Sequence, residues 1–176
     1  STLEEASESD FLIHVIDASG GTNEKGESVE EGSYDPTDDI LFLEKELDMW
    51  YLGILKRGWE KFARTLQQEK LNIVKTIAKQ LSGLRVNEEH VENSLKKLRI
   101  LDKAPESWTE DELLRFARDL RKKTKPMIIA ANKSDKDVSK KNIENLRKKF
   151  KEYIIIPCSS DSELALREAA KKEIIK

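Results

Sequence analysis

The sequence predicts an α/β fold in which a parallel sheet is interrupted along the chain by an all-helical segment. Three short apolar runs, near residues 11–16, 127–131 and 153–157, have the length and composition of buried strands. The last two runs alternate with helical patterns, and this order is typical of a parallel sheet. Between residues 36 and 123 the apolar residues recur at helical spacing. The sheet and the helical segment are therefore expected to be separate layers of structure.

The first predicted strand covers residues 11–16 and is followed by Asp17 and by the pair Gly20 and Gly21. Its apolar residues are continuous rather than alternating, which predicts burial on both faces, as in a parallel sheet. Residues 18–37 contain almost no apolar side chains, so we expect a solvated loop there.

Four helices are expected within residues 36–123. The first begins at Pro36, with Asp35 as its N-cap, and ends near Gly58. The second runs as one helix from Trp59 to Gln80, and Gly83 is a suitable C-terminal cap.

The remaining helix starts are predicted from capping residues. Asn87 begins the third helix, and the Thr109–Glu112 spacing of a capping box begins the fourth. After the second strand Ser139 is expected to cap a helix, and after the third strand Ser160 or Ser162 is expected to cap the last one.

Composition excludes several classes of protein and site. A single cysteine, Cys158, allows no internal disulfide and no zinc site built from cysteine clusters, and it fits a cytoplasmic location. With His14 and His90 as the only histidines, a histidine-rich metal site is excluded too. No apolar run approaches the ~18 residues that a membrane span needs, so no membrane partner is predicted.

The motif with the most chemical content follows the strand at 127–131 and reads Asn132-Lys133-Ser134-Asp135. Ligands of open α/β sheets bind beyond the carboxyl ends of the strands. The Asp135 carboxylate can accept hydrogen bonds from N1–H and the amino group of guanine, a donor pair that adenine lacks. Lys133 can lay its aliphatic stem over the base, and Asn132 can join neighbouring loops through its amide.

A second motif, Cys158-Ser159-Ser160, follows the next strand. Backbone N–H groups in such a turn can face the carbonyl oxygen of guanine. Ser159 and Ser160 are therefore predicted to complete a pocket whose other half is the motif at 132–135.

These motifs carry a family resemblance. Residues 132–135 resemble the fourth GTPase motif, NKxD, and residues 158–160 resemble the fifth. The segments Ile13–Gly20, Gly58–Phe62 and Pro157–Ala170 resemble archaeal Obg-like GTPases of the YchF-type branch.

The resemblance implies a partial P-loop NTPase-type sheet with an inserted helical domain. Residues 1–35 and 124–176 would form part of a G domain, and residues 36–123 would be the insertion. It implies GTP or GDP as ligand, GTP hydrolysis with Mg²⁺ in the intact parent, and contact with the ribosome or RNA.

The resemblance is also incomplete. None of the seven glycines is followed by lysine, so the Walker A motif is absent from this sequence, and the family's C-terminal TGS domain would be missing as well. We therefore predict no catalytic or metal-binding residue here and expect this chain to be inactive by itself. Asp17–Gly20 matches the D-x-x-G pattern of the third GTPase motif, but we interpret it as a decoy, because the family's motif lies at the end of another strand.

An alternative hypothesis is that the helical segment is an RNA- or protein-interaction module and that no nucleotide is bound. Basic clusters at Arg121–Lys125 and Lys148–Lys151 would then contact phosphates. Trp50, Trp59 and Trp108 are expected to be core residues rather than platforms on which bases stack.

Overall fold

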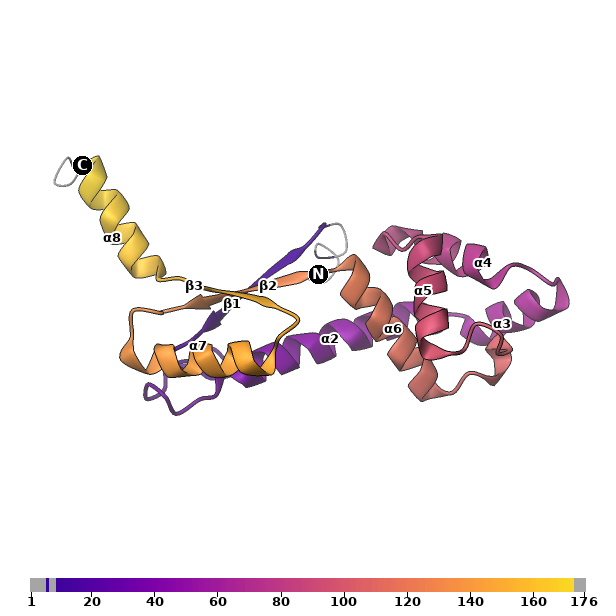
Figure 1. Cartoon of the computed structure of the whole chain (residues 1–176), viewed down its shortest axis with the longest axis horizontal. Coiled ribbons are helices and arrows are strands. Elements are labelled where there is room, and N and C mark those ends of the chain that lie inside the picture. Colours follow the sequence, from indigo (N-terminus) through magenta and orange to yellow (C-terminus); the bar gives the residue numbers. More distant parts are fainter. Residues whose placement is uncertain (1–5, 7–8, 173–176) are drawn as a thin grey trace. The chain divides into compact units, whose positions relative to one another are not determined.

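The computed structural model describes residue 6 and residues 9–172, which Figure 1 shows as a ribbon. The chain divides into two compact units. The sheet unit contains Ile13–Leu43 and Met127–Lys176, and the helical unit contains Ser1–Leu12 and Glu44–Pro126. Among the described residues, no helix combines the length and apolar character of a membrane span.

Three strands form the sheet, in the order β1 (Leu12–Asp17), β2 (Met127–Asn132) and β3 (Ile154–Pro157). β2 and β3 are parallel, with Ile129 opposite Ile155. The predicted α/β class with a parallel sheet is confirmed, and all three predicted strands are present within one residue of their expected bounds.

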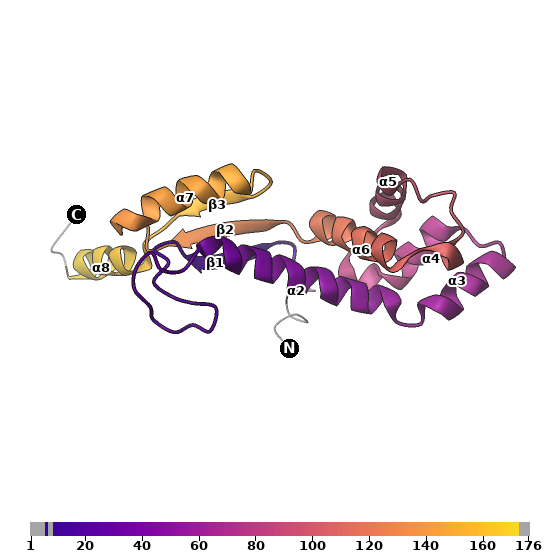
Figure 2. The same ribbon diagram turned by 90° about the horizontal axis from the view of Figure 1, so that it is seen from below.

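One face of the sheet is covered by helices. α7 (Asp137–Lys149) and the first turns of α2 (Pro36–Lys56) lie on the same side of the strands (Figures 1 and 2). The strand residues that point to this side are buried, as are the helix residues that meet them. The buried set includes Ile16, Ile40, Ile129, Ile143, Leu146 and Ile155.

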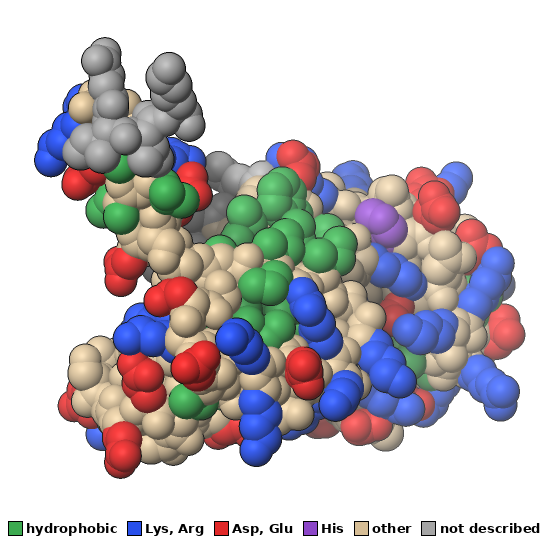
Figure 3. Space-filling model, turned by 60° about the vertical axis from the view of Figure 1, so that its left-hand side comes forward, with side chains coloured by type: hydrophobic (Ala, Val, Ile, Leu, Met, Phe, Trp, Pro, Cys, Tyr) green, Lys and Arg blue, Asp and Glu red, His purple; other side chains and the backbone are tan. Residues whose placement is uncertain are grey.

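The opposite face of the sheet is exposed, so the expectation that β1 is buried on both faces is wrong. Ile13 and Val15 in β1 are 61% and 60% exposed, and Ile154 and Ile156 in β3 are 64% and 49% exposed. Figure 3 shows hydrophobic side chains gathered on one surface of the molecule. The physical reason is that both covering helices lie on the same side, and α8 (Ser160–Lys171) buries none of its residues.

The helical unit has a continuous core, which includes Trp59, Leu95, Trp108 and Phe116. Besides the second part of α2, its elements are α3 (Trp59–Gln68), α4 (Ile73–Gln80), the 3-10 turns η1 (Ser82–Leu84) and η2 (Pro105–Ser107), α5 (Glu88–Leu98) and α6 (Glu110–Thr124).

The single helix predicted from Trp59 to Gln80 is in fact two helices, so the segment has five helices rather than four. The chain turns at Lys70, whose φ of 49° lies in the left-handed region. Asn72 then caps α4, because its side chain accepts a hydrogen bond of 3.0 Å from the Lys75 backbone N–H. Gly83 lies inside η1 and does not cap the preceding helix.

The cap predictions at Asn87 and Thr109 are confirmed. Asn87 caps α5, and Thr109 forms a capping box with Glu112 at the start of α6. The predictions for the starts of α7 and α8 are wrong by a few residues. α7 begins at Asp137, so Ser139 lies in its first turn, and Ser159 rather than Ser160 or Ser162 caps α8.

Candidate functional site

A pocket of about 320 Å³ opens at the carboxyl ends of β2 and β3. Both sequence motifs contribute to it, although they are 26 residues apart along the chain. The pocket is lined by all five predicted site residues: Asn132, Lys133, Asp135, Ser159 and Ser160.

Asn132, the last residue of β2, connects the two motifs. Its side-chain oxygen accepts hydrogen bonds from the Ser160 backbone N–H at 3.0 Å and from the Ser160 hydroxyl at 3.1 Å. Its backbone carbonyl accepts a hydrogen bond of 2.9 Å from the Ala18 N–H, next to the end of β1. One asparagine thus joins the carboxyl ends of all three strands.

Lys133 follows directly and has a φ of 58°, in the left-handed region that a lysine rarely adopts. The turn is held by the Ser139 hydroxyl, which donates a 2.6 Å hydrogen bond to the Lys133 carbonyl. The Lys133 ammonium donates to the Asp17 carboxylate at 2.8 Å. The backbone turn and this ion pair together hold the lysine side chain along the wall of the pocket.

Asp135 is exposed at the pocket, as a residue must be if it is to reach a ligand. A hydrogen bond with the Ser159 side chain lowers the pKa of Asp135. The side chain is therefore a carboxylate at neutral pH and offers only acceptors. Such a group matches a ligand edge that presents two donors.

A third wall of the pocket comes from the loop after β1, which the sequence analysis treated as a solvated segment. Ser19, Gly21, Val29 and Glu31 line the pocket, and Glu31 forms an ion pair of 3.0 Å with Lys136. The rule that located the motif at 132–135, which places ligands beyond strand ends, also applies to the end of β1 and was the signal that could have found this wall.

Asp17 lies at the end of β1, beside this wall. Its carboxylate accepts hydrogen bonds from Lys133, from the hydroxyls of Ser19 and Thr22, and from the Ser19 backbone N–H. Partial burial raises the pKa of Asp17, but the hydrogen bonds from Lys133 and the two hydroxyls outweigh it and lower the pKa to about 2. Asp17 is therefore a carboxylate throughout the physiological pH range.

Neither His14 nor Cys158 has the surroundings of a catalytic group. Burial lowers the pKa of His14, and its Nδ1 is buried without a hydrogen-bond partner among the described residues. Cys158 is half-buried, and its Sγ lies 4.0 Å from the Asn132 side-chain oxygen. Within residues 9–172 no cluster of three or more His, Cys, Asp or Glu side chains is arranged to hold a metal ion.

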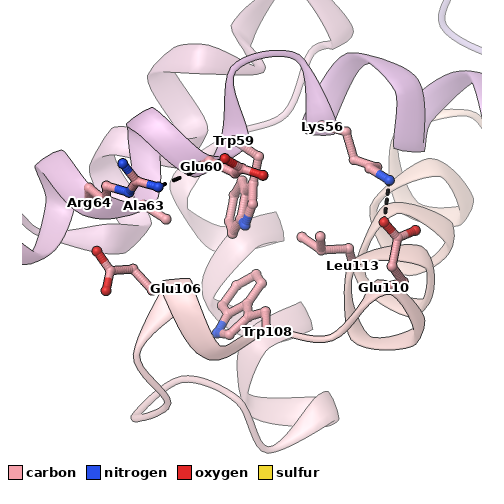
Figure 4. Close-up of a pocket in the computed structure, with 9 residues that line it drawn as sticks. All are labelled: Lys56, Trp59, Glu60, Ala63, Arg64, Glu106, Trp108, Glu110 and Leu113. Atoms are coloured by element: carbon pink, nitrogen blue, oxygen red, sulfur yellow. Dashed lines mark hydrogen bonds and ion pairs between the residues drawn. The ribbon is translucent and has the colours of Figure 1, made fainter.

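The helical unit has a larger pocket of about 530 Å³ (Figure 4). Trp59 and Trp108 lie in its wall with ring centroids 5.2 Å apart, yet each is only 7% exposed. At its mouth Lys56 pairs with Glu110, as Figure 4 shows. The prediction that these tryptophans are core residues is confirmed, because their faces pack on each other and on neighbouring rings.

The basic cluster at Arg121–Lys125 does not form a free cationic surface. Arg121 is 1% exposed and lies 2.8 Å from the Asp48 carboxylate, and Lys123 lies 2.6 Å from Asp119. Lys125 is also buried and donates to the Ser9 carbonyl at 2.7 Å. The cluster therefore serves the packing of the helical unit, and this part of the RNA-binding hypothesis loses its support.

Comparison with known protein families gives a match to part of the chain. Residues 130–176 match a family model described as Obg-like GTPase YGR210-like, G4 motif-containing domain. This segment contains α7, β3 and α8, the whole of both motifs and all five predicted site residues.

Similarity to individual proteins extends over nearly the whole chain. It is 49% identical over 174 residues to the uncharacterized GTP-binding protein MJ1332 of Methanocaldococcus jannaschii, covering 99% of this chain and 43% of that protein. It is 30% identical over 174 residues to the uncharacterized GTP-binding protein C428.15 of Schizosaccharomyces pombe, covering 99% of this chain and 42% of the relative.

A solved structure has the same fold. The crystal structure of a GTP binding protein from Pyrococcus horikoshii OT3 matches with a TM-score of 0.87 at 41% identity, covering all of this chain and 51% of the other. The chain thus spans about half the length, or less, of the proteins that it matches.

Proposed function

Residues 130–176 match the G4 motif-containing domain of Obg-like GTPases, and on that premise we propose that this chain supplies the guanine-recognition part of a GTP-binding protein. The observation that carries the proposal is the pocket at the ends of β2 and β3, because it gathers Asn132, Lys133, Asp135, Ser159 and Ser160 around one volume.

Each residue has a defined part in the proposal. Asp135 accepts hydrogen bonds from N1–H and the amino group of guanine, and the aliphatic stem of Lys133 lies against the plane of the base. Asn132 already accepts the Ser160 N–H and hydroxyl. Ser160 therefore acts by fixing Asn132, and contact with the guanine carbonyl is assigned to the turn at Ser159.

The phosphates and the chemistry are proposed to depend on other parts of a longer protein. No Walker A sequence occurs in these 176 residues, and the relatives are about twice as long. The exposed sheet face supports this proposal, since parallel sheets are normally covered on both faces. GTP hydrolysis with Mg²⁺, the P-loop and a TGS domain are accordingly assigned to the longer protein, and no Mg²⁺ ligand in this chain is proposed.

The proposal also covers the domain arrangement and the partners. Residues 36–123 are proposed to be a helical insertion between the two parts of the G domain, residues 1–35 and 124–176, in a cytoplasmic protein of the YchF-type branch. For contact with the ribosome or RNA, the cluster Lys148–Lys151 is the better candidate, because Lys148, Lys149 and Lys151 are exposed.

The test is a change of base specificity. An Asp135→Asn variant replaces one acceptor by a donor, so it mismatches the guanine amino group and matches the carbonyl that xanthine has at the same position. In titration calorimetry of the full-length natural protein, we expect GDP affinity to fall by about 100-fold or more and affinity for xanthosine diphosphate to rise.

The matched control is Asp137→Asn, which alters an exposed aspartate two residues away, on α7 and outside the pocket. Its affinities should equal those of the unaltered protein. If the unaltered protein fails to bind GDP, or binds GDP and ADP equally, guanine recognition at this pocket is refuted. Binding to RNA with a steep salt dependence, in the absence of nucleotide binding, would favour the interaction-module alternative instead.

A further inference from the structure

The strongest unassigned contact near the pocket joins two strand ends that are far apart in sequence. Asp17 ends β1 and Lys133 follows β2, and the Lys133 ammonium lies 2.8 Å from Asp17 Oδ2. The Asp17 side chain is 10% exposed, whereas that of Lys133 is 41% exposed. The buried partner is therefore the fixed one, and the lysine extends from it along the pocket wall.

The Asp17 carboxylate is itself held on both oxygens. Oδ1 accepts the Ser19 N–H at 2.9 Å and the Ser19 hydroxyl at 2.6 Å. Oδ2 accepts the Thr22 hydroxyl at 2.7 Å in addition to Lys133. A carboxylate with this many donors cannot rotate without losing several hydrogen bonds, so its position is set before any ligand arrives.

The loop that supplies these donors is tightly built. Gly20 has a φ of 62°, and a Cβ at this position would lie 2.2 Å from the Tyr34 carbonyl oxygen, so only glycine fits. Asn142 of α7 donates a 2.9 Å hydrogen bond to the Ala18 carbonyl. The Asp17–Gly20 segment, which matches D-x-x-G by sequence, is therefore a rigid support beside the pocket.

We infer that Asp17 is a positioning residue for base binding, which holds the Lys133 side chain so that its aliphatic stem lies against the guanine plane. The inference rests on the proposed function, because it acts through Lys133 in the guanine pocket. Asp17 itself does not line that pocket. Because Asp17 holds the Lys133 side chain before the base arrives, the lysine loses less conformational entropy when the base binds.

Another ion pair of the same pocket shows why Asp17 is singled out. Lys136 and Glu31 are 3.0 Å apart, but their side chains are 45% and 49% exposed. Such a pair is screened by water and salt and fixes its members weakly. Of these two pairs, the Asp17–Lys133 pair is the one with a nearly buried member whose carboxylate oxygens both accept further hydrogen bonds.

The experiment is a double-mutant cycle on the full-length natural protein with GDP as the probe, measured by titration calorimetry. The variants are Asp17→Asn, Lys133→Ala and the two combined, with Asp137→Asn as the matched control. Asp17→Asn should weaken GDP binding about fivefold. In the Lys133→Ala background the same change should have almost no further effect, because the residue through which Asp17 acts is gone.

A merely structural role would give a different result. If Asp17 only stabilised its loop, Asp17→Asn would lower the thermal midpoint and would weaken binding equally in both backgrounds. Additive losses, or GDP binding unchanged in Asp17→Asn, overturn the inference while leaving guanine binding intact. If the unaltered protein does not bind GDP, the proposed function fails, and the inference fails with it.

Discussion

The helical unit and the sheet unit differ in how completely they bury their apolar side chains and pair their buried charges. In the helical unit Trp59, Trp108 and Phe116 pack in one core, and buried charges such as Arg121 are paired with carboxylates. In the sheet unit one face carries Ile13 and Ile154 into solvent. The first resembles a structural module complete in itself, whereas the second presents apolar surface and polar strand ends to something else.

The largest expected effect tests whether the core of the helical unit is as complete as it looks. Phe116 is 0% exposed and packs edge-on against Trp108, with the two ring centroids 5.5 Å apart. A Phe116→Ala substitution should lower the free energy of unfolding by about 3–5 kcal/mol, because it removes apolar contacts and leaves a cavity. Urea unfolding followed by tryptophan fluorescence measures this selectively, since Trp50, Trp59 and Trp108 all lie in the helical unit.

The control is Leu71→Ala, which removes an apolar side chain of the same unit that is 42% exposed. Its effect should stay within about 0.5 kcal/mol. Equal losses from the two substitutions would mean that the helical unit lacks the tight core described above.

A smaller loss of stability is expected when the pH is lowered, because a buried carboxylate of the helical unit becomes protonated. Partial burial raises the pKa of Asp119, but hydrogen bonds from Lys123, Lys97 and Ser94 outweigh it and lower the pKa to about 2. A carboxylate whose pKa is lower in the folded state stabilises the fold above its unfolded pKa of 3.8 and loses that contribution as pH falls towards 2.

This contribution is about 2 kcal/mol. The unfolding free energy of the helical unit should therefore fall between pH 4 and pH 2, and Asp119→Asn should remove most of that pH dependence. Tryptophan-detected unfolding at a series of pH values is the measurement. If the Asp119→Asn variant keeps the full pH dependence of the unfolding free energy, that dependence comes from other carboxylates.

Features of the two units that depend on local signals could be predicted from the sequence. Thr109 was recognised as a cap because Glu112 lies three residues further along, and Asn87 because asparagine is a favoured N-cap residue. The five pocket residues of the two motifs were predicted because strand-end positions bind ligands in open α/β sheets, whichever helices cover the sheet. Each of these predictions depends on short stretches of chain whose chemistry is self-contained.

One error was local, and the others arose where distant parts of the chain decide the structure. The helical pattern continues through Lys70, yet the chain turns there because Asn72 offers a competing cap. The loop after β1 was not predicted to line the pocket, since the Glu31–Lys136 ion pair joins residues 105 positions apart. The apolar pattern of β1 predicted two buried faces, and within this chain only one of them is covered.

The smallest expected effect concerns the exposed face of the sheet and compares two neighbouring residues of β3. Ile154 is 64% exposed and Ile155 is 6% exposed, on opposite faces of the same strand. In this 176-residue chain Ile154→Thr should change the unfolding free energy by no more than about 0.5 kcal/mol, whereas Ile155→Thr should cost about 2 kcal/mol or more. Urea unfolding followed by circular dichroism measures both.

The same pair measured in the full-length protein sharpens the contrast between the units. If further chain covers the exposed face, Ile154 becomes buried there, and Ile154→Thr should then cost about 1–3 kcal/mol while the cost of Ile155→Thr stays the same. An Ile154→Thr cost that is equally small in both proteins would mean that the face stays open to solvent, so that the apolar residues of β1 and β3 must be explained by a separate partner rather than by the rest of the polypeptide.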